Sequence, residues 1–187
     1  MIDEMKTIEV GPYTLVARFN QGAFRGALWS GGKVIRRAEG HSLDDVWNKL
    51  QAIVEKEFEH QVSARAGAEP TAEEACCAFL HIERKLTVGQ KAMLRAHLRA
   101  DGNNITATQL AVAAGYNGYS AANLQYGLLG AMLFAEIPQV LPRRKDNSPI
   151  MTCVIAHQGD QCLTGEGHWI WKMRPYIVEG LTAAAIL

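Results

Sequence analysis

One stretch of the sequence, residues 106–126, limits what the chain can fold into more than any other. It reads TATQLAVAAGYNGYSAANLQY, an alanine-rich segment followed by a run of glycine, tyrosine and asparagine. The run predicts a tight turn, Ser120 is a good N-cap for a second helix, and the small residues Ala111 and Gly115 let two helices cross closely. The pattern is typical of a helix-turn-helix, whose second helix enters a DNA major groove. A helical hairpin inside an ordinary core is the alternative.

Polar side chains that can read bases surround the start of the second helix. Asparagine and glutamine can pair with adenine, and tyrosine and serine can reach phosphates. The candidate nucleic-acid-binding residues here are Asn117, Tyr119, Ser120, Asn123, Gln125 and Tyr126. No lysine or arginine occurs between residues 100 and 142, so charge must come from elsewhere, and the run Arg143, Arg144 and Lys145 is the nearest source. A neutral helix-turn-helix is also a common protein-binding module.

The elements around this stretch predict a winged-helix-like unit over residues 86–187. A helix precedes it, and the second helix of the stretch continues to about Ile137, where Pro138 ends it. Gly127 and Gly130 share a face with Asn123 and predict close approach by another helix or by a ligand, close helix packing being the commoner cause. The other expected elements are a helix at 88–100, a strand at 150–156, a loop at 157–167, a strand at 168–173 and a helix at 176–186.

The N-terminal residues 1–60 predict a separate small unit. Apolar and polar residues alternate with a period of two, and Gly31-Gly32 is a hairpin signal. The expected elements are strands at 13–20, 23–30 and 33–39, then a helix from Leu43 to about Glu59 capped by Ser42. We therefore expect an α+β fold, with a three-stranded antiparallel sheet and one helix at the N-terminus. Residues 61–85 are expected to form a linker and a short helix capped by Thr71.

The predicted sheet has a basic face. Alternation places Arg18, Arg25 and Trp29 on the face away from the helix, and we assign Arg36 to it, although a one-residue slip would exchange Arg36 for Arg37. Arginines beside an exposed tryptophan suit phosphate contact with base stacking. A solvated face whose arginines cover Trp29 is the alternative. In architecture alone the layout resembles the three-stranded-sheet DNA-binding domains of the AP2 and integrase arm-binding type.

Composition narrows the function classes. Lysine plus arginine equals aspartate plus glutamate at 19 each, which counts against a general nucleic-acid coat protein. The four cysteines form no CxxC pair, and there is no apolar run of membrane-spanning length, so we expect a reduced, cytoplasmic protein with no membrane partner. Common catalytic motifs are absent, and we expect neither enzymatic activity nor a cofactor. A small hydrolytic site near His157, Asp160, Glu166 and His168 is left open.

A metal site was considered at the predicted hairpin. Cys153, His157, Cys162 and His168 are the types of ligand that zinc takes in fours. On a regular strand, however, Cys153 and His157 would lie roughly 13 Å apart, too far to share one ion. We therefore predict no metal, and leave the four residues as an open alternative.

The C-terminal half resembles a known group of proteins. The segments AAGYNGYSAANLQYGLLG at 113–130 and GHWIWKMRP at 167–175 are similar to a poorly characterised domain of bacterial and phage proteins. That domain is associated with HNH nucleases and mobile elements. No HNH motif occurs in this chain, so the resemblance implies recognition or regulation without cleavage.

These observations lead to two expectations about function. The first is a non-enzymatic protein that binds nucleic acid, most simply double-stranded DNA or a nucleoprotein complex, in a phage, mobile-element or host-defence context. The second is a protein-binding inhibitor or adaptor, such as a phage-encoded antagonist of CRISPR or restriction complexes, in which aromatic side chains anchor the interface. A homodimer is compatible with either.

Overall fold

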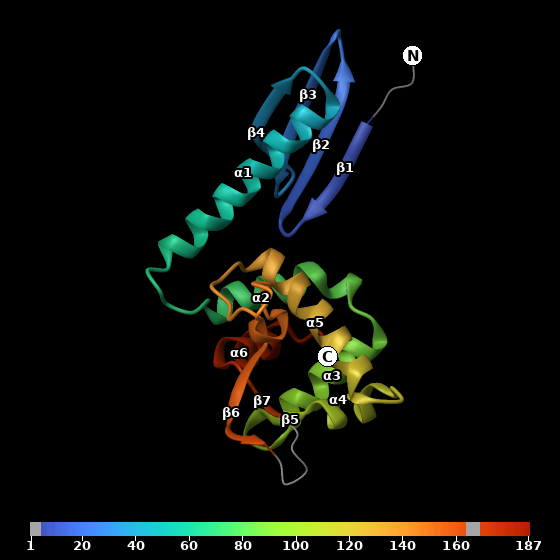
Figure 1. Cartoon of the computed structure of the whole chain (residues 1–187), viewed down its shortest axis with the longest axis vertical. Coiled ribbons are helices and arrows are strands. Elements are labelled where there is room, and N and C mark those ends of the chain that lie inside the picture. The colour runs from blue at the N-terminus through green and yellow to red at the C-terminus, as the bar shows by residue number, and fades with distance from the viewer. Residues whose placement is uncertain (1–4, 164–168) are drawn as a thin grey trace. The chain divides into compact units, whose positions relative to one another are not determined.

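The computed structural model describes the backbone of residues 5–163 and 169–187, and the side chains of residues 5–157 and 169–187. The chain divides into two compact units, Met1–Gly67 and Ala68–Leu187. Both contain helices and strands, so the expected α+β class is confirmed (Figure 1). The segment expected to be a linker is shorter than predicted, because the first helix runs on to Ala64 and the next begins at Ala72.

The first unit is a four-stranded antiparallel sheet with one helix across one face (Figure 1). Its strands follow chain order: β1 (Met5–Val10), β2 (Tyr13–Asn20), β3 (Ala23–Ser30) and β4 (Lys33–Gly40). The prediction of three strands is wrong, because β1 is an edge strand whose residues are nearly all exposed. A strand without a buried face shows no apolar alternation, so its sequence, MKTIEV, carries only a weak signal.

Helix α1 (Leu43–Ala64) covers the inner face of this sheet. Ser42 caps it as expected, its hydroxyl accepting a hydrogen bond from the Asp45 backbone N–H over 3.1 Å. Leu15 and Leu28 from the sheet and Val46 and Leu50 from the helix are fully buried. At Gly26 a β-carbon would lie 2.6 Å from Val46 Cγ1, so this glycine allows the close approach of helix and sheet.

A β-bulge in β4 decides which side chains face the helix. Arg36 pairs with Leu28 while Val34 pairs with Trp29, so Ile35 is the extra residue. A hairpin without the bulge would have placed Arg36 opposite Ala27 on the outer face. The assignment of Arg36 to that face is therefore wrong: Arg36 lies on the helix side and binds Glu57 of α1, with Nη2 3.0 Å from Oε1. Arg37, which pairs with Ala27, takes the outer position.

The second unit contains five α-helices and one three-stranded sheet among its described residues. The helices are α2 (Ala72–Ile82), α3 (Val88–Arg99), α4 (Ala107–Ala114), α5 (Tyr119–Glu136) and α6 (Pro175–Ala184). Capping boxes begin three of them, at Thr71, Thr87 and Thr106. Helix α2 packs on α6 and contributes Phe79 to the main core, so it belongs to this unit and not to a linker.

The sheet of this unit joins strands far apart in the chain. Strands β5 (Asn104–Thr106), β6 (Ala156–Leu163) and β7 (Trp169–Met173) lie in the order β5-β7-β6, and both pairings are antiparallel. The strand predicted at 150–156 is wrong: Met151–Val154 is a 3₁₀ helix, η3. Strand β6 begins only at Ala156, the last residue of the predicted strand, and continues to Leu163 through part of the segment predicted as a loop. Residues 151–156 are mostly buried, and a short buried apolar run can form either a strand or a helix. The sequence pattern alone therefore could not distinguish a strand from the 3₁₀ helix.

The carbonyl of Met151 explains one of the two glycines expected to allow close packing. A β-carbon at Gly130 would lie 2.1 Å from Met151 O, so η3 rests directly on α5 at this point. Gly127, one turn earlier, has nothing within 4 Å of its β-carbon position. The close approach predicted for the glycine face is therefore confirmed at Gly130 and absent at Gly127.

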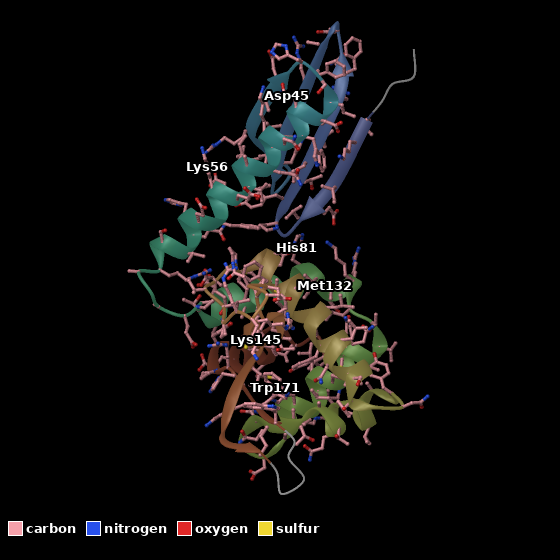
Figure 2. All side chains as sticks on the ribbon, in the orientation of Figure 1. Asp45, Lys56, His81, Met132, Lys145 and Trp171 are labelled. Carbon is pink, nitrogen blue, oxygen red and sulfur yellow. The ribbon has the colours of Figure 1, made fainter. Side chains whose placement is uncertain are left out.

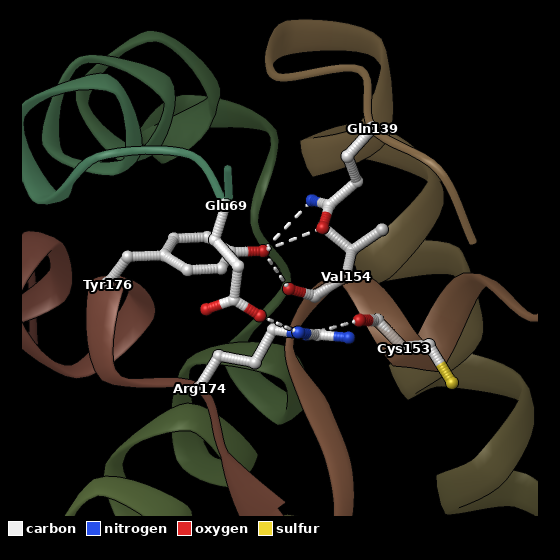
Figure 3. A network of polar contacts seen from close by, with 6 residues as sticks. All are labelled: Glu69, Gln139, Cys153, Val154, Arg174 and Tyr176. Atoms are coloured by element: carbon white, nitrogen blue, oxygen red, sulfur yellow. Dashed lines mark hydrogen bonds and ion pairs between the residues drawn. The ribbon is translucent and has the colours of Figure 1, made fainter. Parts of the chain in front are cut away.

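Two polar networks fix the loops of this unit. Tyr176 Oη donates to Val154 O over 2.6 Å and meets Gln139, whose Nε2 lies 2.9 Å away. Arg174 Nε donates to Cys153 O over 2.7 Å, and the same guanidinium binds Glu69 (Figure 3). Together these contacts hold both ends of the segment 139–153. The second network, between His97 and Tyr126, lies in the core and is described below.

Candidate nucleic-acid interface

The turn between α4 and α5 is built as the sequence predicts, with one difference at the helix start. Gly115 ends α4 in the left-handed conformation, with φ of 70°, and its N–H returns to Ala111 and Val112. Helix α5 begins at Tyr119 with Gly118 as N-cap, not at Ser120, and no side chain caps its first N–H groups. Ser120 therefore lies in the first turn of α5, where it is exposed.

The structure separates the six candidate residues of this region into two groups. Asn117, Tyr119, Ser120 and Asn123 are exposed around the start of α5. Gln125 is half-buried, and its side chain lies 3.5 Å from Gln90 Nε2. Tyr126 is fully buried, so its assignment to a nucleic-acid surface is wrong.

Tyr126 belongs to a hydrogen-bonded core network instead. His97 Nε2 lies 3.0 Å from both Asn103 O and Trp171 O, and carbonyls only accept, so Nε2 carries the proton. Nδ1 then accepts from Tyr126 Oη over 2.6 Å. Burial lowers the pKa of His97 to about 4 and raises the pKa of Tyr126. The pair ties α3, α5 and β7 together and leaves no group free for a ligand.

Two leucines share the exposed face of α5 with the polar residues. Leu124 is 62% exposed and Leu128 is 49% exposed, and helical spacing places them in line with Ser120. This pair is not among the residues predicted from the sequence, although their spacing against the buried Ala122, Tyr126 and Leu129 indicates an exposed face. The start of this face is therefore polar and its middle apolar.

The basic run forms a compact loop with its own internal bonds. Arg143 Nη1 donates to Asn147 O over 2.8 Å, and Arg144 Nη1 donates to Pro149 O over 3.1 Å. Asp146 accepts from both the N–H and the hydroxyl of Ser148, and these hydrogen bonds hold the pKa of Asp146 below its ordinary value. All three bases are exposed, so three positive charges and one negative charge are held on one rigid turn.

The basic loop and the exposed polar residues belong to opposite halves of α5. The loop leaves the helix after Ile137 and returns at Met151, which touches Gly130. Asn117 and Ser120 lie at the other end of this helix of 18 residues, about 27 Å long. The two groups are thus fixed to one helix, the loop at its C-terminal half and the polar side chains at its N-terminal end.

The outer face of the first unit carries the other candidate residues. Register places Arg18 directly opposite Arg25, and Trp29 opposite Thr14, with the Val16–Ala27 pair between them. Arg25 Nε forms an ion pair with Glu39 on β4 over 3.1 Å. Arg37 completes the face in place of Arg36. The sequence allows this exchange by a one-residue slip but does not predict the bulge that causes it, because a bulge made of ordinary residues has no local signature.

The alternative metal site is tested only in part. Cys153 is buried and His157 is half-buried, with burial raising the pKa of the Cys153 thiol, whereas the side chains of Cys162 and His168 lie outside the described residues. Asp160 and Glu166, of the hydrolytic alternative, lie outside them as well. Within the described part of the chain no cluster of three or more histidine, cysteine or carboxylate side chains could hold an ion.

Comparison with known proteins gives no match. No family model matches the chain, and no curated protein or solved structure resembles it significantly. The resemblance noted for residues 113–130 and 167–175 therefore stays a prediction. None of the described helices is both long enough and apolar enough to cross a bilayer.

Proposed function

We propose that the chain binds double-stranded DNA through its second unit, which has the element order of a winged helix. Helix α3, strand β5, helices α4 and α5 and strands β6 and β7 follow one another, and the sheet order is β5-β7-β6. In that arrangement the helix in the position of α5 lies in the major groove. The segment 137–155, inserted between α5 and β6, distinguishes this chain from the simplest form.

One observation carries the proposal: exposed polar side chains surround the uncapped start of α5. Asn117, Ser120 and Asn123 can meet base edges, and the positive end of the helix dipole at this N-terminus favours a phosphate. The basic loop at the other half of the helix supplies charge that α5 lacks. Since the unit holds ten basic and ten acidic residues, its binding depends on where the charges lie and not on their total.

Fluorescence anisotropy with a labelled duplex of random sequence tests this function. We expect micromolar binding at about 50 mM salt, because groove readers bind nonspecific duplex in that range. Replacing Arg143, Arg144 and Lys145 with alanine should weaken binding to all sequences and flatten the salt dependence by up to about three units of slope. Lys56→Ala, at an exposed position of α1, is the control for loss of one surface charge (Figure 2).

Asn123→Ala tests base reading separately from phosphate contact. It should alter sequence preference in a selection from random duplexes while leaving the salt dependence unchanged. An absence of duplex binding at low salt, or a triple variant that binds as tightly as the parent, would overturn the proposal.

The exposed leucines favour a second candidate function, binding of a protein partner. Leu124 and Leu128 form an apolar surface on a helix face without charge, which suits a helix-in-groove interface. Under this function the double variant Leu124→Ser, Leu128→Ser should lose a partner captured from host extract that Asn123→Ala retains. If the chain instead binds DNA, Asn123→Ala should change the preference among duplex sequences more than the double leucine variant does.

A further inference from the structure

The outer face of the first sheet holds two arginines whose side chains have no partner among the described residues. Arg18 and Arg37 are exposed, and neither side chain has a hydrogen-bond or ion-pair partner among the residues that the structure describes. Arg18 also lies directly opposite Arg25, and like charges in that position destabilise a sheet. Glu39 binds Arg25 but leaves the Arg18 side chain unmatched, so an anion from outside would relieve the remaining repulsion.

Trp29 lies on the same face and is 38% exposed. It is separated from Arg25 by one residue of the same face, Ala27, so their α-carbons lie about 13 Å apart along β3. The pair between them, Val16–Ala27, is apolar. The described acidic residues of this face, Glu9 and Glu39, lie on the two edge strands.

From this layout we infer that the outer face of the N-terminal sheet binds single-stranded nucleic acid. Arg18, Arg25 and Arg37 would contact phosphates, and Trp29 would stack on a base, which is the combination that sequence-tolerant single-strand binders use. A duplex fits less well, because paired and stacked bases hide the ring faces on which Trp29 would stack. The inference concerns the first unit alone and does not depend on duplex binding by the second.

The bulge in β4 supplies a matched pair of variants. Arg36 and Arg37 are neighbours with the same charge. Arg36 binds Glu57 on the helix side, whereas the Arg37 side chain lies on the outer face and contacts no described partner. Arg36→Gln and Arg37→Gln therefore remove one charge each from opposite faces of one strand. Thermal unfolding of both variants checks that each remains folded.

The test measures binding of a labelled twelve-nucleotide oligo(dT) to the full chain by anisotropy at low salt. We expect Arg37→Gln and Arg18→Gln each to weaken binding ~3-fold or more, and Trp29→Ala to weaken it ~5-fold or more, since stacking on an aromatic ring contributes strongly per base. Arg36→Gln and the Arg143–Lys145 alanine variant should bind oligo(dT) as the parent does.

Three results would overturn the inference. The first is no oligo(dT) binding at micromolar protein. The second is an equal loss for Arg36→Gln and Arg37→Gln, which would show diffuse attraction by charge. The third is a silent Trp29→Ala together with tighter binding of a matched duplex, which would assign the face to groove contact. Because the basic-loop variant affects only duplex binding by the second unit, failure of one proposal is distinguishable from failure of the other.

Discussion

Tyr126 Oη and His97 Nδ1 lie 2.6 Å apart in the core of the second unit, and the imidazole is neutral there. Both carbonyls that face Nε2 accept a hydrogen bond from its N–H, so a second proton on Nδ1 would displace the tyrosine donor. The arrangement makes the stability of the unit depend on pH.

The pH dependence of folding should carry the signature of His97. Its pKa is about 4 in the folded chain and 6.5 in the unfolded chain, so the unfolded state binds more protons between these values. Stability is therefore fully present above pH 6.5 and falls by about 3 kcal/mol as the pH drops to 4. Urea unfolding at several pH values measures it. His97→Gln should flatten this window, and a parallel slope in the variant would exclude His97 as the group responsible.

Removal of the tyrosine hydroxyl should destabilise the fold without touching the DNA surface. Tyr126→Phe leaves His97 Nδ1 as a buried acceptor without a donor, which costs about 1–3 kcal/mol. Denaturant unfolding gives the loss. Duplex affinity of the folded variant should equal that of the parent, since Tyr126 is buried. A change in the DNA sequence preference of this variant would show that Tyr126 does contribute to DNA recognition.

The two glycines of α5 should respond to alanine in opposite directions. Gly130→Ala forces a β-carbon against a backbone carbonyl, Met151 O, which cannot move without shifting η3, and should cost about 1–3 kcal/mol. Gly127→Ala enters open space in a helix interior and should stabilise by about 0.5–1 kcal/mol. Thermal unfolding of the two variants is the measurement. Equal destabilisation would contradict the close contact of η3 with α5.

The basic loop should bind duplex more tightly when its acid is removed. Asp146→Asn keeps an acceptor for Ser148, so the loop retains its shape while its net charge rises by one. We expect duplex affinity to rise roughly 2- to 5-fold at about 50 mM salt and the gain to shrink at about 200 mM. Glu55→Gln makes the same charge change at an exposed position of α1 and is the control. A similar gain in both variants would show that the loop has no special part in binding.

Much of the fold followed from local chemistry. The hairpin glycines, Ser42 and Thr71 marked turns and helix starts that the structure confirms, because caps and turns are decided by neighbouring residues. Strand β1 and helix η3 were missed for a different reason. An edge strand without a buried face and a short buried 3₁₀ turn are both selected by tertiary packing, which leaves no period in the sequence.

The exposed polar residues of the candidate site could be predicted from the sequence. Which neighbouring residues are buried and do not belong to the site could not. Asn117, Ser120 and Asn123 are exposed as the helix-turn-helix pattern requires, and their part in binding stays a prediction. Tyr126 was misassigned because a tyrosine beside polar neighbours reads equally well as core or surface. What separated the two was a partner 29 residues away, His97, and such long-range pairing cannot be read from one sequence.

The bulge at Ile35 connects the inside of the first unit to its outside. With the extra residue, the small side chains Ala38 and Gly40 face α1, and at Gly40 a β-carbon would already lie 2.5 Å from Asp45 Oδ2. Without it, Arg37 and Glu39 would point toward the helix, where there is no room for them. The choice of which arginine reaches an outside ligand is thus made by the packing of the core. Changes to this surface during evolution must therefore keep the strand in phase with the helix beneath it.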